Sequence, residues 1–204
     1  PSAAITPTTI WVKPGSTAAL SAQITNRDAA GCSATTFQLS ASNTTGGTST
    51  VTPASTSVAP GQGTSASITV AGISSSGTVT LTVKDNDGVD PSHSLDGQGT
   101  AQIAVDGTAP SAPTNLSSAL VTKGVKLTWS SASDSGGSGV ATYYVYRNGA
   151  KIGATTSLSY TDSTGTSGTT YTYTVTSVDG VGYESGNSNS TTITTKSSKG
   201  GKPR

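Results

Sequence analysis

Residues 169 to 179 read Thr-Thr-Tyr-Thr-Tyr-Thr-Val-Thr-Ser-Val-Asp, and this run decides the fold class. Tyr171, Tyr173 and Val175 recur at every second position, which is the period of a strand that buries one face. A tyrosine that opens such a strand late in a β-sandwich domain acts as a corner when its hydroxyl bonds to nearby backbone. The run therefore predicts a β-sandwich in which both tyrosines point inward.

The same alternation continues through the second half of the chain. Alternating segments cover residues 125–129, 142–147, 157–162, 171–178 and 190–195, and clusters of Gly and Ser, such as residues 134–139, separate them. Asn148-Gly149 between two strands indicates a hairpin, because both residues tolerate a positive φ. Several short strands with regular turns are typical of a sandwich.

The first half shows the same features with different residues. Strands are expected at residues 19–26, 36–41, 65–70 and 77–83, and Pro-Gly turns at 14–15 and 60–61. The segment 107–113 contains two prolines among small residues, so it reads as a short linker. We therefore expect an all-β chain of two consecutive β-sandwich domains, with domains at 1–106 and 114–196 and a basic tail at 197–204.

The composition narrows the classes of function. Charged residues make up 10% of the chain and the net charge is +1, which argues against nucleic acid because a basic face supplies most of that affinity. No apolar run approaches the roughly 20 residues that a membrane-spanning helix needs. Low charge with abundant Ser and Thr is typical of secreted modules, so an extracellular location is predicted.

A set of motifs appears in a fixed order in the second half. The motifs are Pro113-Thr-Asn-Leu116, Val125-Lys-Leu-Thr-Trp129, Tyr143-Tyr-Val-Tyr-Arg-Asn-Gly149, Thr170-Tyr171 and Val178-Asp179. This order resembles a fibronectin type III domain, in the bacterial form attached to secreted chitinases, cellulases, depolymerases and peptidases. The resemblance implies that Leu127, Trp129, Tyr143 and Val145 point inward. Tyr144 and Tyr146 then fall on the outward face.

A looser set of motifs marks the first half. Val12-x-Pro-Gly, Thr25-Asn-Arg-Asp28, Cys32-x-x-x-x-Phe37 and Ala59-Pro-Gly-Gln62 resemble an immunoglobulin-like module of the kind that follows bacterial secreted peptidases and glycosidases. The two resemblances imply a non-catalytic accessory region of a secreted bacterial hydrolase, which acts as a spacer and binds a polysaccharide or protein polymer weakly. The alternative is a structural subunit that self-associates in an extracellular fibre or surface layer.

The inventory of reactive residues argues against an enzyme. The chain has one histidine, His93, one glutamate, Glu184, and one cysteine, Cys32. His93 lies in a turn-rich loop without a nucleophile elbow, and a zinc site needs three or four ligands, mainly His and Cys. A Cys32–His93 dyad is the competing arrangement, but nothing around it indicates an activated thiol. Cys32 is expected to be a small buried residue near a strand, or otherwise to form an intermolecular bridge.

Asp85, Asp87 and Asp90 form the candidate metal site. With Gly88 allowing a tight bend, they resemble the start of an oxygen-rich calcium loop, although the bidentate glutamate at its far end is missing. The competing interpretation, which we favour, is a polar loop whose Asp and Asn residues serve turns. No other cofactor is indicated.

Outward aromatic residues form the candidate binding site. Tyr144, Tyr146 and Tyr183 can stack on sugar rings or anchor a protein partner, because planar rings add contact area at low entropic cost. The competing interpretation is that tyrosine is simply a good strand residue. Trp11, beside a Pro-Gly turn, is expected to plug one end of the first sandwich.

Overall fold

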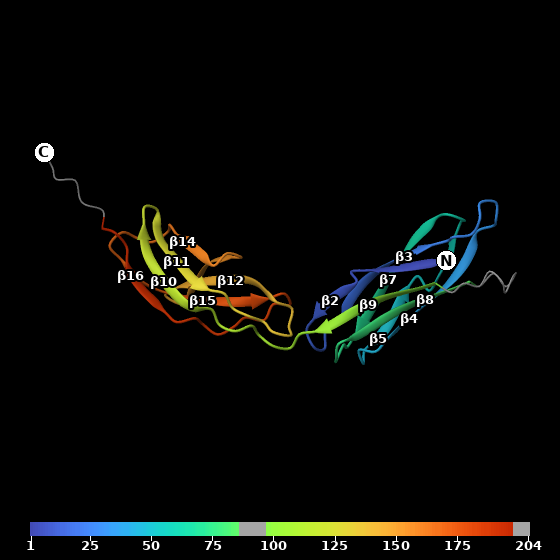
Figure 1. Ribbon diagram of the computed structural model, residues 1–204, viewed down its shortest axis with the longest axis horizontal. Coiled ribbons are helices and arrows are strands. Elements are labelled where there is room, and N and C mark those ends of the chain that lie inside the picture. Colours follow the sequence, from blue (N-terminus) through green and yellow to red (C-terminus); the bar gives the residue numbers. More distant parts are fainter. Residues whose placement is uncertain (86–96, 198–204) are drawn as a thin grey trace. The chain divides into compact units, whose positions relative to one another are not determined.

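The computed structural model describes residues 1–85 and 97–197, and every regular element within them is a β-strand. Contacts divide the chain into two units, Pro1–Gly107 and Thr108–Arg204. Each unit consists of two β-sheets, as Figure 1 shows, so the all-β class with consecutive sandwiches is confirmed. Within the described residues there is also no helix long and apolar enough to cross a lipid bilayer.

The described residues of the first unit form nine strands. One sheet has the order β1-β3-β7-β5 and the other the order β2-β9-β8-β4-β6. The strands are β1 (Ser2–Thr6), β2 (Thr9–Val12), β3 (Ala18–Thr25), β4 (Thr35–Asn43), β5 (Thr48–Thr52), β6 (Ser55–Val58), β7 (Gly63–Ala71), β8 (Gly77–Asp85) and β9 (Gly97–Val105). β1 pairs antiparallel with β3, whereas β2 pairs parallel with β9. The chain therefore changes sheet around Pro7, which cannot donate to a ladder.

An aliphatic core holds the first unit together. In β3 the residues Ala18, Leu20, Ala22 and Ile24 are buried while their neighbours face outward. The facing sheet contributes buried residues that include Phe37, Leu39, Val79, Leu81, Val83 and Ile103. Each large aliphatic or Phe side chain buried in this way contributes about 1.5–3 kcal/mol.

In the second unit, the part that the structure describes, up to residue 197, forms seven strands. Its sheets have the orders β10-β11-β14 and β13-β12-β15-β16. The strands are β10 (Thr114–Val121), β11 (Gly124–Ser130), β12 (Val140–Arg147), β13 (Ala150–Thr155), β14 (Ser159–Asp162), β15 (Thr170–Asp179) and β16 (Thr191–Thr194). All strand pairs in these two sheets are antiparallel. The segment before β10 is bonded to the same unit, since Ser177 Oγ donates to the carbonyl of Ser111.

The core of the second unit is aromatic. Tyr173 is fully buried, and Trp129 and Tyr143 meet edge-on with ring centroids 5.7 Å apart. Such a pair contributes about 0.5–1.5 kcal/mol beyond the area it buries. The predicted inward positions are confirmed, because the buried set comprises Leu127, Trp129, Tyr143, Val145, Tyr171, Tyr173 and Val175 together with Leu116 and Val125.

The predicted turns are present where the backbone needs a positive φ. Asn148 and Gly149 have φ values of 51° and 80°, as a two-residue type I′ hairpin requires. Asn148 also bonds the adjacent strand, because its Oδ1 accepts the N–H of Thr172 at 2.9 Å. Gly15 and Gly61 have φ values of 77° and 71° in the two Pro-Gly turns.

Two expectations about single residues were wrong. Cys32 is exposed, because it lies in the connection between β3 and β4, where its N–H donates to the carbonyl of Ala29 in a turn. Trp11 does not plug the sandwich, since 39% of it is exposed. It occupies an outward position of β2 beside the buried Val12.

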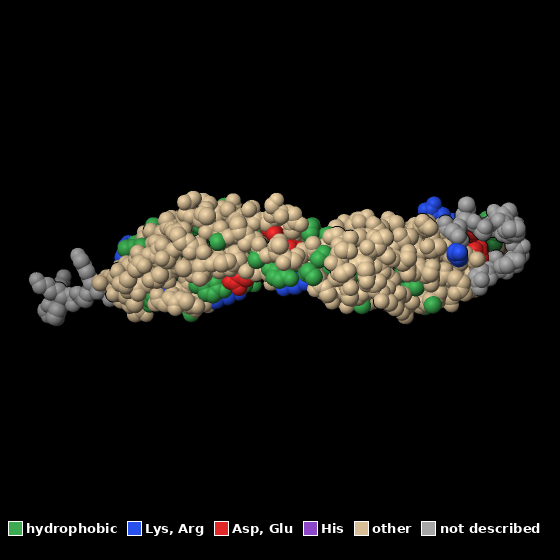
Figure 2. All heavy atoms as spheres, turned by 90° about the horizontal axis from the view of Figure 1, so that it is seen from below, with side chains coloured by type: hydrophobic (Ala, Val, Ile, Leu, Met, Phe, Trp, Pro, Cys, Tyr) green, Lys and Arg blue, Asp and Glu red, His purple; other side chains and the backbone are tan. Residues whose placement is uncertain are grey.

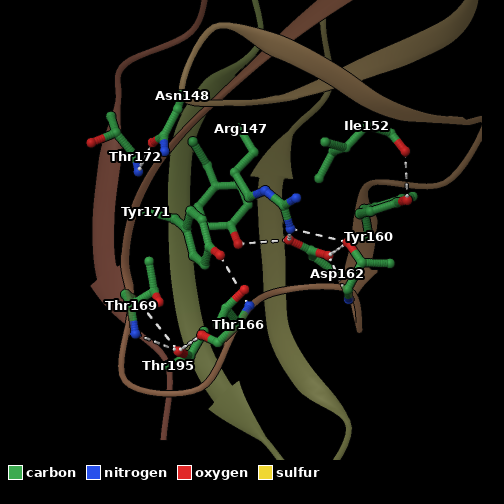
Figure 3. Close-up of polar contacts among 12 residues, drawn as sticks. Arg147, Asn148, Ile152, Tyr160, Asp162, Thr166, Thr169, Tyr171, Thr172 and Thr195 are labelled. Carbon is green, nitrogen blue, oxygen red and sulfur yellow. Dashed lines mark hydrogen bonds and ion pairs between the residues drawn. The ribbon is translucent and has the colours of Figure 1, made fainter.

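A tyrosine corner closes the second unit. The Tyr171 hydroxyl accepts the N–H of Thr166, five residues upstream, at 3.0 Å. The same turn is held to β16, because Thr195 Oγ1 donates to the carbonyl of Thr166 and accepts the N–H of Thr169. The predicted corner is therefore confirmed, and Figure 3 shows its hydroxyl directed at Thr166.

We expect Tyr171→Phe to lower the melting temperature of the second unit by about 3–6 °C, because it removes this bond and leaves the Thr166 N–H unpaired. The chain has two tryptophans, one in each unit. In a Trp11→Phe background the fluorescence of the buried Trp129 therefore reports the second unit alone. Tyr144→Phe, which removes an outward hydroxyl, is the matched control. An equal loss in both variants would contradict the corner's role.

Candidate binding face on the second unit

Tyr144 and Tyr146 lie on the outward side of β12, as the strand's period requires. They are half-buried, whereas Tyr143 and Val145 between them are buried. Across the ladder to β15 they face Thr176 and Thr174. Towards β13 they face Ala154 and Lys151, with a register shift between the two pairs. The cross-strand neighbours of the outward tyrosines are therefore two threonines, one alanine and one lysine.

Lys151 covers the ring of Tyr144. Its ammonium group lies over the ring face, 2.8 Å from the centroid, in a cation–π contact. Such contacts contribute about 0.5–1 kcal/mol at exposed sites. Because this ring face is already occupied by a cation, Tyr144 is less open to a stacked ligand than its exposure suggests.

Glu184 fixes the hydroxyl of Tyr146. The Tyr146 hydroxyl and Thr176 Oγ1 both donate to Glu184 Oε1, each at 2.6 Å. The hydrogen bond to Glu184, with a smaller contribution from burial, raises the pKa of Tyr146 above its ordinary value. The hydroxyl of Tyr146 therefore stays protonated, and its ring is held in one orientation by Glu184. The second oxygen of that carboxylate, Oε2, is not used in these two hydrogen bonds.

A hollow of about 330 Å³ lies beside this pair. Its lining consists of Tyr146, Gly149, Thr174, Thr176, Glu184, Ser185, Gly186 and Asn187. Tyr183, the third predicted aromatic residue, is outside this lining. It lies between β15 and β16, where its backbone N–H donates to Asp179. Of the three tyrosines predicted to bind a ligand, Tyr144, Tyr146 and Tyr183, Tyr146 is the one that lines the hollow.

Sequence reasoning did not select Glu184 or Lys151 for this face. Glu184 is 38 residues from Tyr146, and only the bridge between Val178 and Glu184 brings it alongside. Lys151 could have been found from the hairpin, because a two-residue turn places it opposite Tyr146. No comparable local signal indicates Glu184.

An inter-sheet network begins at the residue after Tyr146. Arg147 donates to Asp162 Oδ2 at 2.8 Å, and the hydroxyl of Tyr173 donates to the same oxygen at 2.8 Å. The Arg147 guanidinium also lies 4.6 Å from the centroid of the Tyr171 ring. Figure 3 shows Arg147 stacked on Tyr171 and directed at Asp162. Since Asp162 ends β14, the network joins the two sheets.

The Asp162 carboxylate is buried and fully bonded. Its Oδ1 accepts the N–H and the hydroxyl of Thr164 at 2.9 and 2.7 Å. Burial by itself would raise the pKa of Asp162, but the hydrogen bonds from Thr164, Tyr173 and Arg147 outweigh it and hold that pKa below the usual range. Burial and the bond to Asp162 raise the pKa of Tyr173.

The candidate calcium loop is only partly within the described residues. Asp85 ends β8, where it pairs with Phe37 of β4. Asp87 and Asp90 lie outside the described residues, as does His93. A calcium role for Asp85, Asp87 and Asp90 stays a prediction. On the face of the molecule that Figure 2 shows, charged and hydrophobic side chains are sparse.

Part of the chain is similar in sequence to regions of bacterial hydrolases. No protein-family model matches the chain. Exoglucanase B of Cellulomonas fimi is 44% identical over 97 residues, which are 47% of this chain and 9% of that protein. Chitinase 63 of Streptomyces plicatus is 41% identical over 96 residues, 47% of this chain and 15% of that protein. The chain thus spans less than a fifth of either hydrolase.

A solved structure covers nearly the whole chain. The fibronectin(III)-like modules of Clostridium thermocellum CbhA align with 96% of this chain and 94% of that chain, at a TM-score of 0.45 and 15% identity. The strand order confirms the expected all-β class. The described residues form two consecutive β-sandwich units. About half of the chain is similar in sequence to a limited region of these two hydrolases.

We expect Asp162→Asn to destabilise the second unit by about 2–3 kcal/mol at pH 7, because it leaves Arg147 without its charged partner. The pKa of Asp162 is lowered on folding. Its stabilising contribution is therefore complete above the unfolded pKa of about 4 and is lost as the pH falls through the folded value.

The measurement is urea unfolding of the Trp11→Phe and Trp11→Phe/Asp162→Asn chains between pH 7 and pH 2, followed by Trp129 fluorescence. The difference in unfolding free energy should shrink below about pH 4. Glu184→Gln, which alters an exposed carboxylate of the same unit, is the control. A difference that is constant over this range would contradict a charge-dependent role.

Proposed function

We propose that the chain is a non-catalytic accessory region of an extracellular hydrolase, which it helps to hold on a polysaccharide. The observation that carries this proposal is the outward ring of Tyr146, oriented by Glu184 at the rim of a hydroxyl-lined hollow. The fold supplies two sandwiches in tandem, which also act as a spacer.

The chemistry of this face matches a neutral, hydroxyl-rich ligand. An aromatic ring offers an apolar surface to the C–H face of a sugar, while the ring hydroxyls need polar partners at its edge. Thr174, Glu184 and Asn187 provide both donors and acceptors around the hollow. The net charge of +1 offers little attraction to a polyanion.

Two of the relatives support the same class of ligand. An exoglucanase and a chitinase carry, by their names, activity on glucan and chitin. A single shallow site of this kind holds one or two sugar units weakly, with a dissociation constant of roughly 0.1–1 mM. Tethering to a catalytic domain converts such weak binding into useful retention, because the second contact becomes intramolecular.

The test is affinity electrophoresis of the chain through gels that contain soluble cellulose, chitin or starch derivatives. We expect retardation by at least one polymer and a loss of about fivefold or more in apparent affinity for Tyr146→Ala, which corresponds to roughly 1 kcal/mol. Glu184→Gln should weaken binding less, because its Oε1 still accepts a hydrogen bond. Leu158→Ala removes an exposed hydrophobic residue elsewhere in the second unit and should change nothing.

Retardation that Tyr146→Ala leaves unchanged would place the binding site elsewhere and contradict the proposal. The absence of retardation by all three polymers would leave only the spacer role. Sedimentation velocity at high protein concentration addresses the fibre alternative, since concentration-dependent end-to-end assembly would favour a structural subunit.

A further inference from the structure

A glycine-rich loop of the second unit is built around the Asp134 carboxylate. The loop runs from Asp134 to Gly139, and the N–H of Gly139 donates to Asp134 Oδ2 at 2.8 Å. Gly137 packs so closely that an added Cβ would lie 2.5 Å from both carboxylate oxygens. A side chain at Gly137 would therefore displace the Asp134 carboxylate from this position.

A second carboxylate, from Asp179 at the end of β15, faces the same loop. Its Oδ1 accepts the N–H groups of Val181 and Tyr183 at 3.0 and 2.8 Å. Only 3% of the residue is exposed. Its Oδ2 is buried and has no hydrogen-bond partner among the described residues. A buried carboxylate oxygen without a partner is costly, so this atom points to a missing ligand.

The two carboxylates are close together. One oxygen of Asp134 and one of Asp179 lie within 4.8 Å of each other. Two negative charges at this distance repel, and burial strengthens the repulsion because the local dielectric is low. In the described part of the chain neither residue has an ion pair with lysine or arginine, in contrast to Asp162. A positive charge between them would satisfy both.

A third oxygen lies beside Asp179. Ser138 Oγ accepts the N–H of Val181 at 3.2 Å, and Asp179 Oδ1 accepts the same N–H. The donor set of the loop is thus made of oxygen only, with two carboxylates and a hydroxyl. Such a set suits a hard cation, and not one that prefers nitrogen or sulfur.

We propose that Asp134 and Asp179 bind a calcium ion and thereby lock the Asp134–Gly139 loop to the end of β15. Calcium accepts six to eight oxygen ligands in flexible geometry, so carbonyl groups and water can complete a site that has two carboxylates. An affinity of roughly 10⁻⁴–10⁻³ M is expected, as in other extracellular modules. This site is independent of the polysaccharide face and of the loop at Asp85.

The test uses the full chain in the Trp11→Phe background, with thermal unfolding followed by Trp129 fluorescence. Adding 10 mM calcium chloride after removal of metal by chelator should raise the melting temperature of the second unit by about 7–13 °C. Asp134→Asn and Asp179→Asn should each abolish most of this rise. Glu184→Gln, which removes a carboxylate outside the site, should keep it.

The stability of the Asp134→Asn variant without metal provides a second test, because here the substitution should not lower stability. Without metal, Asp134→Asn removes the repulsion while an amide oxygen still accepts the Gly139 N–H, so this variant should be as stable as the parent chain or more so. If Asp134 were only a loop cap, the variant would lose stability equally with chelator and with calcium, and the proposal would be overturned.

Two further measurements separate a specific site from general screening. Calorimetric titration with calcium should give one site on the parent chain and none on Asp134→Asn. Magnesium at 10 mM should raise the melting temperature less than calcium, because it demands octahedral geometry and loses water reluctantly. An equal rise with magnesium, or with sodium chloride of the same ionic strength, would overturn the calcium assignment.

Discussion

The second unit depends on one buried carboxylate that its two sheets share. Asp162 ends β14 of one sheet, and its Oδ2 accepts hydrogen bonds from Arg147 and Tyr173 of the other. Because the charge is buried, the loss of any partner leaves an uncompensated group in a low-dielectric core. The network therefore sets the spacing of the sheets. It also fixes β12 at Arg147, the residue after Tyr146, so these core contacts determine where Tyr146 lies on the outward face.

Asp179 shows the opposite way to bury a carboxylate. Both oxygens of Asp162 have donors within the fold, whereas Asp179 uses one oxygen for the turn after β15 and leaves the other without a hydrogen bond in the described residues. Satisfied buried charges rigidify a structure, and unsatisfied ones mark strain or a ligand. Within one domain, Asp162 thus has a structural role, whereas we propose that Asp179 binds a cation.

The cores of the two units, each packed between two sheets, are made of different types of side chain. The first packs small aliphatic side chains, and the second packs a few large aromatic ones. With 31% hydrophobic residues in the chain, few apolar side chains remain for the surface. The binding face that we propose is therefore made from single residues, Tyr146 with Glu184, among small neighbours. Weak, additive contacts are the expected consequence of that composition.

The sequence by itself determined the local architecture, because the period of two and the Asn148-Gly149 turn depend on residues adjacent in the chain. It therefore predicted the inward Tyr173 and the outward Tyr146 correctly. The tertiary structure alone decided which distant residues meet. Glu184 accepts a hydrogen bond from Tyr146, and Asp162 accepts one from Tyr173. Cys32 lies in a loop outside the core. These contacts depend on the register between strands, and a shift of one residue would turn every side chain to the other face.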